Sequence, residues 1–245
     1  MNTSPWNAGG EVEALVHPTA IIDPRANVAP GVAVGPYSII GPGVVVGRGT
    51  VLGPHVLVER DTTLGEQCQI AKGAVIGGDP QDLKYEGEPS HLFVGDRTVV
   101  REYATLNRGT RASGQTVVGS DCLIMAYAHV AHDCEIGNHV VLSNAVNMAG
   151  HVVIEDWASV GGLTAIHQHV RIGAHSFCGG GSRVPQDIPP YLKVAGNPVK
   201  LYGINTVGLE RRGISDDVKR ALKKTYQILF QSKLTLTRAL DLAED

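Results

Sequence analysis

The chain has 245 residues, of which 43% are hydrophobic, and its formal net charge of −3 gives no reason to expect nucleic acid or an anionic membrane as a partner. No apolar run is long enough to cross a bilayer, and residues 1–10 are polar and contain glycine. We therefore expect neither a membrane span nor a secretion signal, and predict a cytoplasmic location. With 30 glycines and 13 prolines against 3 phenylalanines and 2 tryptophans, the composition predicts many turns and small, repeated packing units.

An aliphatic side chain recurs at every sixth residue from Val16 to Ile76, and the same phase returns after an interruption and continues to Val184. Four positions after each of the first members stands a small or β-branched residue. A hexapeptide period is typical of parallel β-helices, in which three units of one short strand and one turn close a coil of eighteen residues. Neither a helical period nor simple alternation gives this spacing. We predict an all-β parallel β-helix over residues 14–190, with residues eighteen positions apart as vertical neighbours.

Two segments interrupt the period. Residues 77–93 contain a polar run that is too hydrophilic for a wall of the β-helix and long enough to fold outward over a neighbouring surface. Long loops on rigid scaffolds usually carry function, so we expect a role for this one. The second segment, residues 108–115, is shorter, and we interpret it as a plain surface loop.

Residues 191–245 lack the period and are predicted to be helical. Ser215, followed by two aspartates, is a good N-cap with an acidic first turn for a helix that runs to about residue 231, and Thr235 can begin a last short helix. This region could cover the open end of the β-helix, whose exposed strands would otherwise favour aggregation. It could equally contribute binding groups, because Arg211 and Arg212 are two adjacent cations.

Histidines interrupt the aliphatic pattern in residues 128–134, which read AHVAHDC. Eighteen positions after His132 stands Gly150, and eighteen and thirty-six after Asp133 stand His151 and His169, so these residues should be neighbours on successive coils. Glycine at position 150 would allow close backbone approach. A carbonyl there could accept the proton of one imidazole nitrogen and leave the other nitrogen free as a base. An amide there could stabilise an oxyanion. This arrangement favours acyl transfer to a hydroxyl.

Two alternatives come from other classes. Trimeric β-helix carbonic anhydrases bind zinc through histidines, two of them five residues apart on one coil, and no two histidines here have that separation. The four cysteines form no C-x-x-C pair and three share one phase of the repeat, which favours buried thiols over a zinc or disulfide framework. A non-catalytic scaffold is the third possibility, but it would have no use for the polar residues 81–84 or for clustered histidines.

Several motifs then carry a family resemblance. They are QDLKY at residues 81–85 with GEP at 87–89, AHVAHDC at 128–134, AGH at 149–151, AIHQ at 165–168, QD with PPY between 186 and 191, and GLERRG at 208–213. Over roughly residues 16–231 the chain resembles the UDP-N-acetylglucosamine 3-O-acyltransferase family, whose members begin lipid A assembly. The related N-acyltransferases are the second candidate within the class, although they normally carry a uridine-binding domain ahead of the β-helix.

The resemblance implies a left-handed β-helix and a homotrimer with each cleft between two subunits. It implies transfer of an (R)-3-hydroxyacyl chain from the phosphopantetheine of acyl carrier protein to the 3-hydroxyl of UDP-N-acetylglucosamine, with no further cofactor and no metal. His132 would be the general base and the Gly150 backbone the oxyanion contact. The remaining residues assigned to substrate binding are Gln81, Asp82, Lys84, His129, Asp133 and His151 towards the sugar and its phosphates, and His167, Gln168, Asn205, Arg211 and Arg212 towards the nucleotide. For Asp133 a role in tuning the charge and a role as a turn residue both stay open.

The chain also departs from the family pattern. Asn107 stands where family members have histidine, which leaves the 3-amino analogue of the sugar as an alternative acceptor. Val207 replaces an acid near the two arginines, and the tail to Asp245 is shorter than the family's helical bundle. Gly180 occupies the position that acts as an acyl-length ruler in the family. Glycine there predicts a chain of about fourteen carbons rather than ten, since each buried methylene contributes about 0.8 kcal/mol, unless Phe177 fills the space.

Overall fold

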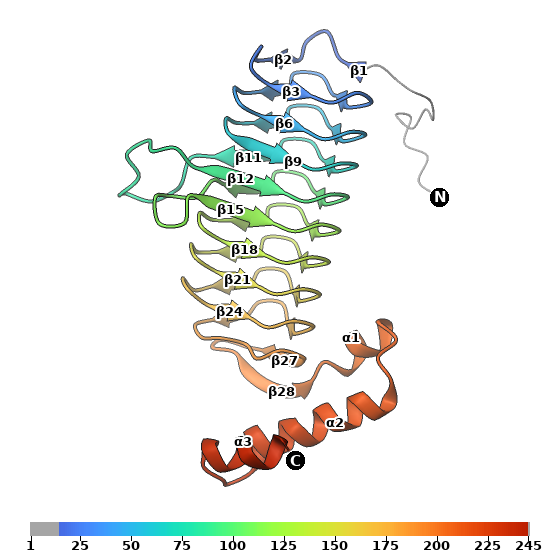
Figure 1. Cartoon of the computed structure of the whole chain (residues 1–245), viewed down its shortest axis with the longest axis vertical. Coiled ribbons are helices and arrows are strands. Elements are labelled where there is room, and N and C mark those ends of the chain that lie inside the picture. The colour runs from blue at the N-terminus through green and yellow to red at the C-terminus, as the bar shows by residue number, and fades with distance from the viewer. Residues whose placement is uncertain (1–14, 245) are drawn as a thin grey trace.

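The computed structural model describes residues 15–244, so the predicted boundaries at residues 14 and 245 lie outside the described part. Short strands form three sheets that wrap around one long axis as a parallel β-helix (Figure 1). The first sheet has 11 strands in the order β1 (Leu15–Val16), β4 (Ala33–Val34), β7 (Val51–Leu52), β10 (Gln69–Ile70), β13 (Val99–Val100), β16 (Leu123–Ile124), β19 (Val141–Leu142), β22 (Ser159–Val160), β25 (Phe177–Cys178), β27 (Leu192–Ala195) and β28 (Lys200–Ile204).

The other two sheets complete each triangular coil. The second sheet has 9 strands, β2 (Ile21–Ile22), β5 (Ile39–Ile40), β8 (Leu57–Val58), β11 (Val75–Gly78), β14 (Thr105–Asn107), β17 (His129–Val130), β20 (Asn147–Met148), β23 (Ala165–Ile166) and β26 (Arg183–Val184). The third has 8 strands, β3 (Asn27–Val28), β6 (Val45–Val46), β9 (Thr62–Leu64), β12 (His91–Val94), β15 (Gln115–Val118), β18 (Glu135–Ile136), β21 (Val153–Ile154) and β24 (Arg171–Ile172).

The predicted register is confirmed. Val130 pairs with Met148, and Met148 pairs with Ile166, each eighteen positions further along the chain. The aliphatic residues of the period point inward and are buried from Val34 onward, whereas Val16, in the first coil of the described residues, is exposed. The small residues that follow them are buried too, and they include Cys68, Cys122 and Cys134 as free thiols. Stacked hydrogen-bonded strands around this aliphatic column make a rigid support for the turns.

Three stacks of turns join the sheets. We call the turns between the second and third sheets the histidine corner, because they contain His132, His151 and His169. The turns between the third and first sheets are the tryptophan corner, after Trp157, and those between the first and second sheets are the glycine corner, after Gly162 and Gly180.

Two coils are longer than the rest. Leu64 pairs with Val94, and Val94 pairs with Val118, so more than eighteen residues separate each pair. The additional residues form a long loop, residues 79–90, and a short loop, residues 108–114. Figure 1 shows both loops projecting from the same side of the β-helix, one above the other. Strands β11 and β12 extend into the predicted interruption at residues 77–93, which leaves the long loop slightly shorter than expected.

The β-structure continues past residue 190, where the sequence predicted the change to helix. β27 pairs with β25 in parallel, and β28 turns back antiparallel on β27. Leu192 and Val194 are buried and complete the last coil, so the preceding prolines bend the chain without ending the wall. The helices then follow as α1 (Thr206–Arg211), α2 (Asp216–Tyr226), the π-helical η1 (Gln227–Gln231) and α3 (Leu236–Glu244). As predicted, Ser215 caps α2, and its hydroxyl accepts a hydrogen bond from the Val218 N–H.

Within residues 15–244, no helix combines the length and the apolar composition that a membrane span requires.

Candidate active site

The histidine corner brings together the residues that the eighteen-residue period predicted as neighbours. Asp133, His151 and His169 each occupy the same place in successive turns, with left-handed φ values of 58°, 61° and 66°. The rings of His151 and His169 stack with centroids 4.7 Å apart, and the ring of His132 meets that of His151 edge-on at 5.3 Å. Because these turns sit on stacked strands, the side chains hold fixed relative positions.

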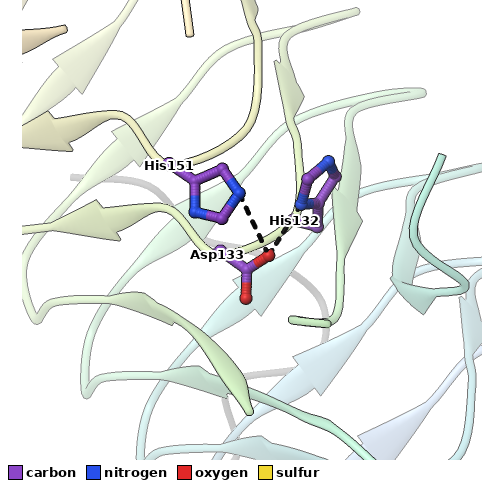
Figure 2. A group of neighbouring side chains, drawn as sticks. All are labelled: His132, Asp133 and His151. Carbon is purple, nitrogen blue, oxygen red and sulfur yellow. Dashed lines mark hydrogen bonds and ion pairs between the residues drawn. The ribbon is translucent and has the colours of Figure 1, made fainter. Parts of the chain in front are cut away.

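His132 is paired with the carboxylate beside it in the sequence. Its Nδ1 lies 2.7 Å from Asp133 Oδ2, and the two side chains are 9% and 0% exposed (Figure 2). An ionised carboxylate can only accept, so Nδ1 carries the proton of the neutral imidazole and Nε2 is left with a free lone pair. The sequence had suggested a carbonyl on the Gly150 coil for this role. That expectation is wrong, since the Gly150 carbonyl instead accepts a hydrogen bond from the His169 N–H.

The Asp133 carboxylate is enclosed by donors from the short loop. Its Oδ1 accepts from the Thr110 N–H at 2.9 Å and from the Ser113 hydroxyl, and its Oδ2 accepts from the Thr110 hydroxyl at 2.7 Å. Burial raises the pKa of this carboxyl, but hydrogen bonds from Ser113, His132 and Thr110 outweigh burial and hold the pKa at about 2. The ionised Asp133 therefore stabilises the folded state fully above the ordinary carboxyl pKa. This stabilisation is lost as the pH falls from there through about 2.

Gly150 leaves space that the imidazole of His132 fills. A Cβ at position 150 would lie 2.5 Å from His132 Cε1, which is closer than nonbonded atoms approach. The Gly150 N–H makes no hydrogen bond among residues 15–244. The predicted close approach of the base to this backbone is thus present, with a free donor beside it.

Two further histidines line the same region in their neutral form. His129 Nδ1 lies 2.7 Å from the Thr105 hydroxyl, and burial lowers the pKa of His129, with a smaller effect from His132. His151 Nε2 lies 3.7 Å from Asp133 Oδ2. Burial lowers the pKa of His151, although the charges of Asp133 and Asp82 oppose that shift. At neutral pH both rings can therefore donate and accept hydrogen bonds to a polar substrate.

The long loop carries Gln81, Asp82 and Lys84 next to this corner. The Asp82 carboxylate accepts a hydrogen bond from the Lys84 N–H at 3.0 Å, which shapes the loop, while the Gln81 and Lys84 side chains are exposed. The amide of Asn107 donates to the Asp79 carbonyl at 2.7 Å at the base of the loop. Asn107 Oδ1 is buried and has no hydrogen-bond partner among the described residues.

The predicted nucleotide-binding residues divide between two corners. His167 and Gln168 are exposed on the same coil as His169, and His167 Nδ1 lies 3.1 Å from the Gln168 carbonyl. Asn205 is at the tryptophan corner, where it caps α1 and its amide donates to the His175 carbonyl at 2.9 Å.

Arg212 also lies at the tryptophan corner, with its guanidinium carbon 3.8 Å from the centre of the Trp157 ring. His139, Trp157, His175 and Tyr191 stack there as a ladder of rings. Arg211 and Val207 both lie in α1 and are exposed. Within one chain this group belongs to a different corner from His132.

The predicted ruler position lies at the third corner. Gly180 is exposed, and a Cβ added to it would lie 3.0 Å from the Gly162 carbonyl oxygen, so a side chain there would fit with a small shift. Phe177 lies on the adjoining strand with 37% of its surface exposed. Its ring is therefore available to fill the space beside Gly180.

One group of side chains has the spacing of a metal site. The ligand atoms of His132, Asp133 and His151 lie within 4.8 Å of one another. However, Asp133 Oδ2 already accepts from both His132 and Thr110, so a metal ion would have to replace those hydrogen bonds. The donor set fits an acid–base pair better than a metal centre.

Sequence reasoning missed Thr110, Ser113 and Trp157. The short loop was interpreted as a plain surface loop, although a threonine and a serine in a second interruption beside the first were a usable signal. The position of Trp157 eighteen residues before His175 would have predicted the stacking at its corner. Nothing in the sequence could have paired Trp157 with an arginine from the tail.

Hexapeptide coils with a buried histidine–carboxylate pair at one corner define a hexapeptide-repeat transferase. In agreement, a profile of the bacterial transferase hexapeptide matches residues 13–48 and 115–150, and a profile described as Udp N-acetylglucosamine O-acyltransferase, domain 2, matches residues 187–245. Among solved structures, LpxA from Acinetobacter baumannii superposes with a TM-score of 0.91 at 42% identity, covering 94% of this chain and 90% of that one. UDP-N-acetylglucosamine acyltransferase from Francisella novicida gives a TM-score of 0.91 at 36% identity, with 93% and 84% covered.

The chain belongs to the UDP-N-acetylglucosamine O-acyltransferase family, which confirms the resemblance seen in its motifs. A curated relative, acyl-(acyl-carrier-protein)–UDP-N-acetylglucosamine O-acyltransferase of Burkholderia thailandensis, is 50% identical over 167 residues. That alignment spans 68% of this chain and 64% of the relative. The corresponding protein of Myxococcus xanthus is 52% identical over 168 residues, spanning 68% of this chain and 65% of its own length.

Proposed function

We propose that this chain transfers an (R)-3-hydroxyacyl group from acyl carrier protein to the 3-hydroxyl of UDP-N-acetylglucosamine, as the first step of lipid A biosynthesis. The observation that carries the proposal is the pair formed by His132 and the buried Asp133, whose imidazole packs against Gly150, a residue whose N–H makes no hydrogen bond among residues 15–244. A base with one nitrogen fixed and one nitrogen free, next to an unpaired amide donor, suits acyl transfer to an alcohol.

The steps follow from these groups. His132 Nε2 removes the proton of the sugar hydroxyl, and the oxygen attacks the thioester carbonyl carbon. The Gly150 N–H stabilises the resulting oxyanion, and Asp133 stabilises the imidazolium that forms. The intermediate collapses with cleavage of the carbon–sulfur bond, and the imidazolium returns its proton to the phosphopantetheine sulfur.

Gln81, Asp82, Lys84, His129 and His151 would hold the sugar and its phosphates. The first three lie on the long loop that leaves the histidine corner, Asp82 is near enough to His151 to affect its pKa, and His132 affects the pKa of both His129 and His151. Arg211, Arg212 and Asn205 lie at another corner, so we propose a homotrimer in which a neighbouring subunit brings its tryptophan corner to this one. Acyl carrier protein would deliver the donor. The buried free thiols and the absence of a disulfide among the described residues suit a reducing compartment, and we place the chain in the cytoplasm.

The 3-amino analogue of the UDP-sugar is the second candidate acceptor. The observation that favours it is Asn107, which replaces the family's histidine and whose buried Oδ1 has no hydrogen-bond partner within residues 15–244. The amino group of that sugar has N–H donors that could form a hydrogen bond with Asn107 Oδ1.

The test is an acyl-transfer assay with (R)-3-hydroxyacyl carrier protein and each of the two UDP-sugars, run on wild type and on Asn107→His. We expect turnover of UDP-N-acetylglucosamine. Transfer to the 3-amino sugar alone, with Asn107→His restoring use of the 3-hydroxy sugar, would establish the second candidate in its place. No transfer to either sugar would contradict both.

A further inference from the structure

The short loop contacts the long loop through a buried arginine. The side chain of Arg108 is 1% exposed, and its guanidinium donates to the Gly77 carbonyl, to the Asp79 carboxylate and, at 3.2 Å, to the Tyr85 hydroxyl. Tyr85 ends the polar motif that carries Gln81, Asp82 and Lys84. A planar group with several donors therefore holds residues on both sides of Gln81, Asp82 and Lys84 at once.

Two later residues of the same short loop contact the partner of the base. Thr110 and Ser113 donate to the Asp133 carboxylate from their backbone N–H groups, at 2.9 Å and 3.3 Å, and from their hydroxyls. A third hydroxyl, from Thr116 at the start of the next strand, accepts from the Asp133 N–H at 2.8 Å. The orientation of Asp133, and with it that of the His132 ring, is set from this loop.

Between Thr110 and Ser113, Arg111 contributes ion pairs from a largely exposed guanidinium, and its backbone N–H donates to the Glu88 carboxylate at 3.1 Å. Arg111 reaches Glu86 at 2.8 Å and Glu88 at 3.6 Å, and its side chain is 63% exposed. Exposed ion pairs contribute little to a fixed geometry. The positioning contacts of the loop are therefore those of Arg108 on the long loop and those of Thr110 and Ser113 on Asp133.

We propose that the short loop, residues 108–114, is a positioning element with two separable sets of contacts: those of Arg108 hold the long loop for substrate binding, and those of Thr110 and Ser113 hold Asp133 for proton transfer. None of its side chains is assigned contact with substrate. The inference rests on the proposed function, because it divides the work of that reaction between binding and chemistry. It predicts that variants of the two sets of contacts affect different kinetic constants.

For the Asp133 contacts we would measure Ser113→Ala and Thr110→Val. Each removes one hydroxyl donor and leaves the negative charge of Asp133 less stabilised by the loop, so the carboxylate interacts more strongly with the protonated form of its histidine partner. We expect kcat to fall by roughly 5- to 50-fold with KM nearly constant, and the acidic limb of the kcat profile to move to higher pH. His129 and His151, which also face this pair, are unchanged in both variants.

For the Arg108 contacts we would measure Arg108→Lys and Tyr85→Phe. Lysine keeps the charge but cannot bridge the Gly77 carbonyl, the Asp79 carboxylate and the Tyr85 hydroxyl together. We expect KM for the UDP-sugar to rise by roughly 5- to 20-fold, with kcat within about threefold and an unshifted pH profile. Tyr85→Phe is the second variant in case Arg108→Lys does not fold. It removes one acceptor of the arginine, the Tyr85 hydroxyl, and leaves the buried guanidinium in place.

Ser120→Ala is the matched control, because the Ser120 hydroxyl accepts from the Asp96 N–H at 3.0 Å in a turn of the tryptophan corner. It should leave both constants within about twofold. If variants of both sets change kcat and KM alike, or change only the melting temperature, the short loop is structural and the inference is wrong.

An activity-independent readout separates this inference from the proposed function. The rate at which diethyl pyrocarbonate modifies His132, followed by peptide mass spectrometry across pH, should have its midpoint shifted upward in Ser113→Ala and unchanged in Arg108→Lys. If wild type transfers no acyl group, the proposed function fails, and this shift still decides whether the loop orients the pair. Equal midpoints in wild type and Ser113→Ala would overturn the inference even in an active enzyme.

Discussion

The histidine corner and the tryptophan corner are built from the same turn, with a left-handed residue stacked every eighteen positions, yet their side chains lie in different environments. His132 and Asp133 are almost completely buried and enclosed by donors from the short loop. At the other corner, Trp157 and His175 are half-buried, and the Arg212 beside them is exposed. Under the proposed function, the comparison predicts that proton transfer is organised within one chain, whereas nucleotide recognition uses the exposed ladder of rings at the tryptophan corner.

The largest expected effect is at the base itself. His132→Ala should leave the β-helix folded and lower kcat by the roughly 10²- to 10⁴-fold that lost general-base catalysis costs. Steady-state kinetics with circular dichroism as the folding control would measure this. Activity within a few-fold of wild type would remove His132 from the mechanism and the chemistry from this corner.

Gly150→Ala should also lower kcat, because the added methyl group would occupy space that the imidazole of His132 fills. The new Cβ would lie 2.5 Å from His132 Cε1, so the ring must rotate away from Asp133. We expect kcat to fall by about 10²-fold, the usual order for a misplaced catalytic group. Gly53→Ala is the control, with its Cβ 3.1 Å from the Lys72 N atom on another coil. Equal effects of the two variants would mean that Gly150 serves only the fold.

At the tryptophan corner the expected effect is smaller and falls on binding. Trp157→Leu removes the ring under Arg212, a contact of about 0.5–2 kcal/mol, so KM for the UDP-sugar should rise by roughly 2- to 30-fold with kcat little changed. Tyr37→Leu, at a stacked pair with His55 in the early coils, is the control. A fall in kcat without a change in KM would contradict the division between the corners.

The smallest expected effect concerns acyl length at the glycine corner. Gly180→Met should shift preference towards shorter donors while leaving the rate with them largely intact, since each methylene contributes about 0.8 kcal/mol when buried. Rates with donors of about ten to fourteen carbons would measure it. A wild type that already prefers ten carbons, or a variant that loses all lengths equally, would make Phe177 the residue to examine.

The period was sufficient to predict which residues stack, because a coil of constant length fixes every vertical neighbour. His132 beside Gly150, and Asp133 beside His151, follow from counting alone. The partner of the imidazole could not be predicted in this way, because Asp133 is its neighbour in sequence and its donors come from a loop whose conformation depends on buried polar contacts. The pairing of Trp157 with Arg212 joins a wall to a helical tail, and no repeat relates the two.

The strands β27 and β28 show the same limit. Prolines at the end of the period predicted a change to helix, and local preference was the only guide available there. Tertiary packing decided otherwise, because Leu192 and Val194 close the end of the aliphatic column.

The most direct test of the central claim, that a buried ionised Asp133 makes His132 the base, is the pH dependence of acyl transfer by Asp133→Asn. Its pKa of about 2 means that Asp133 is charged at every pH at which the enzyme would be assayed. We expect kcat to fall by roughly 10²- to 10⁴-fold at neutral pH with KM for the UDP-sugar within about threefold, because asparagine fills the site without the charge that orients and stabilises the imidazolium. A variant that keeps kcat within a few-fold of wild type, with the same acidic limb, would contradict the claim.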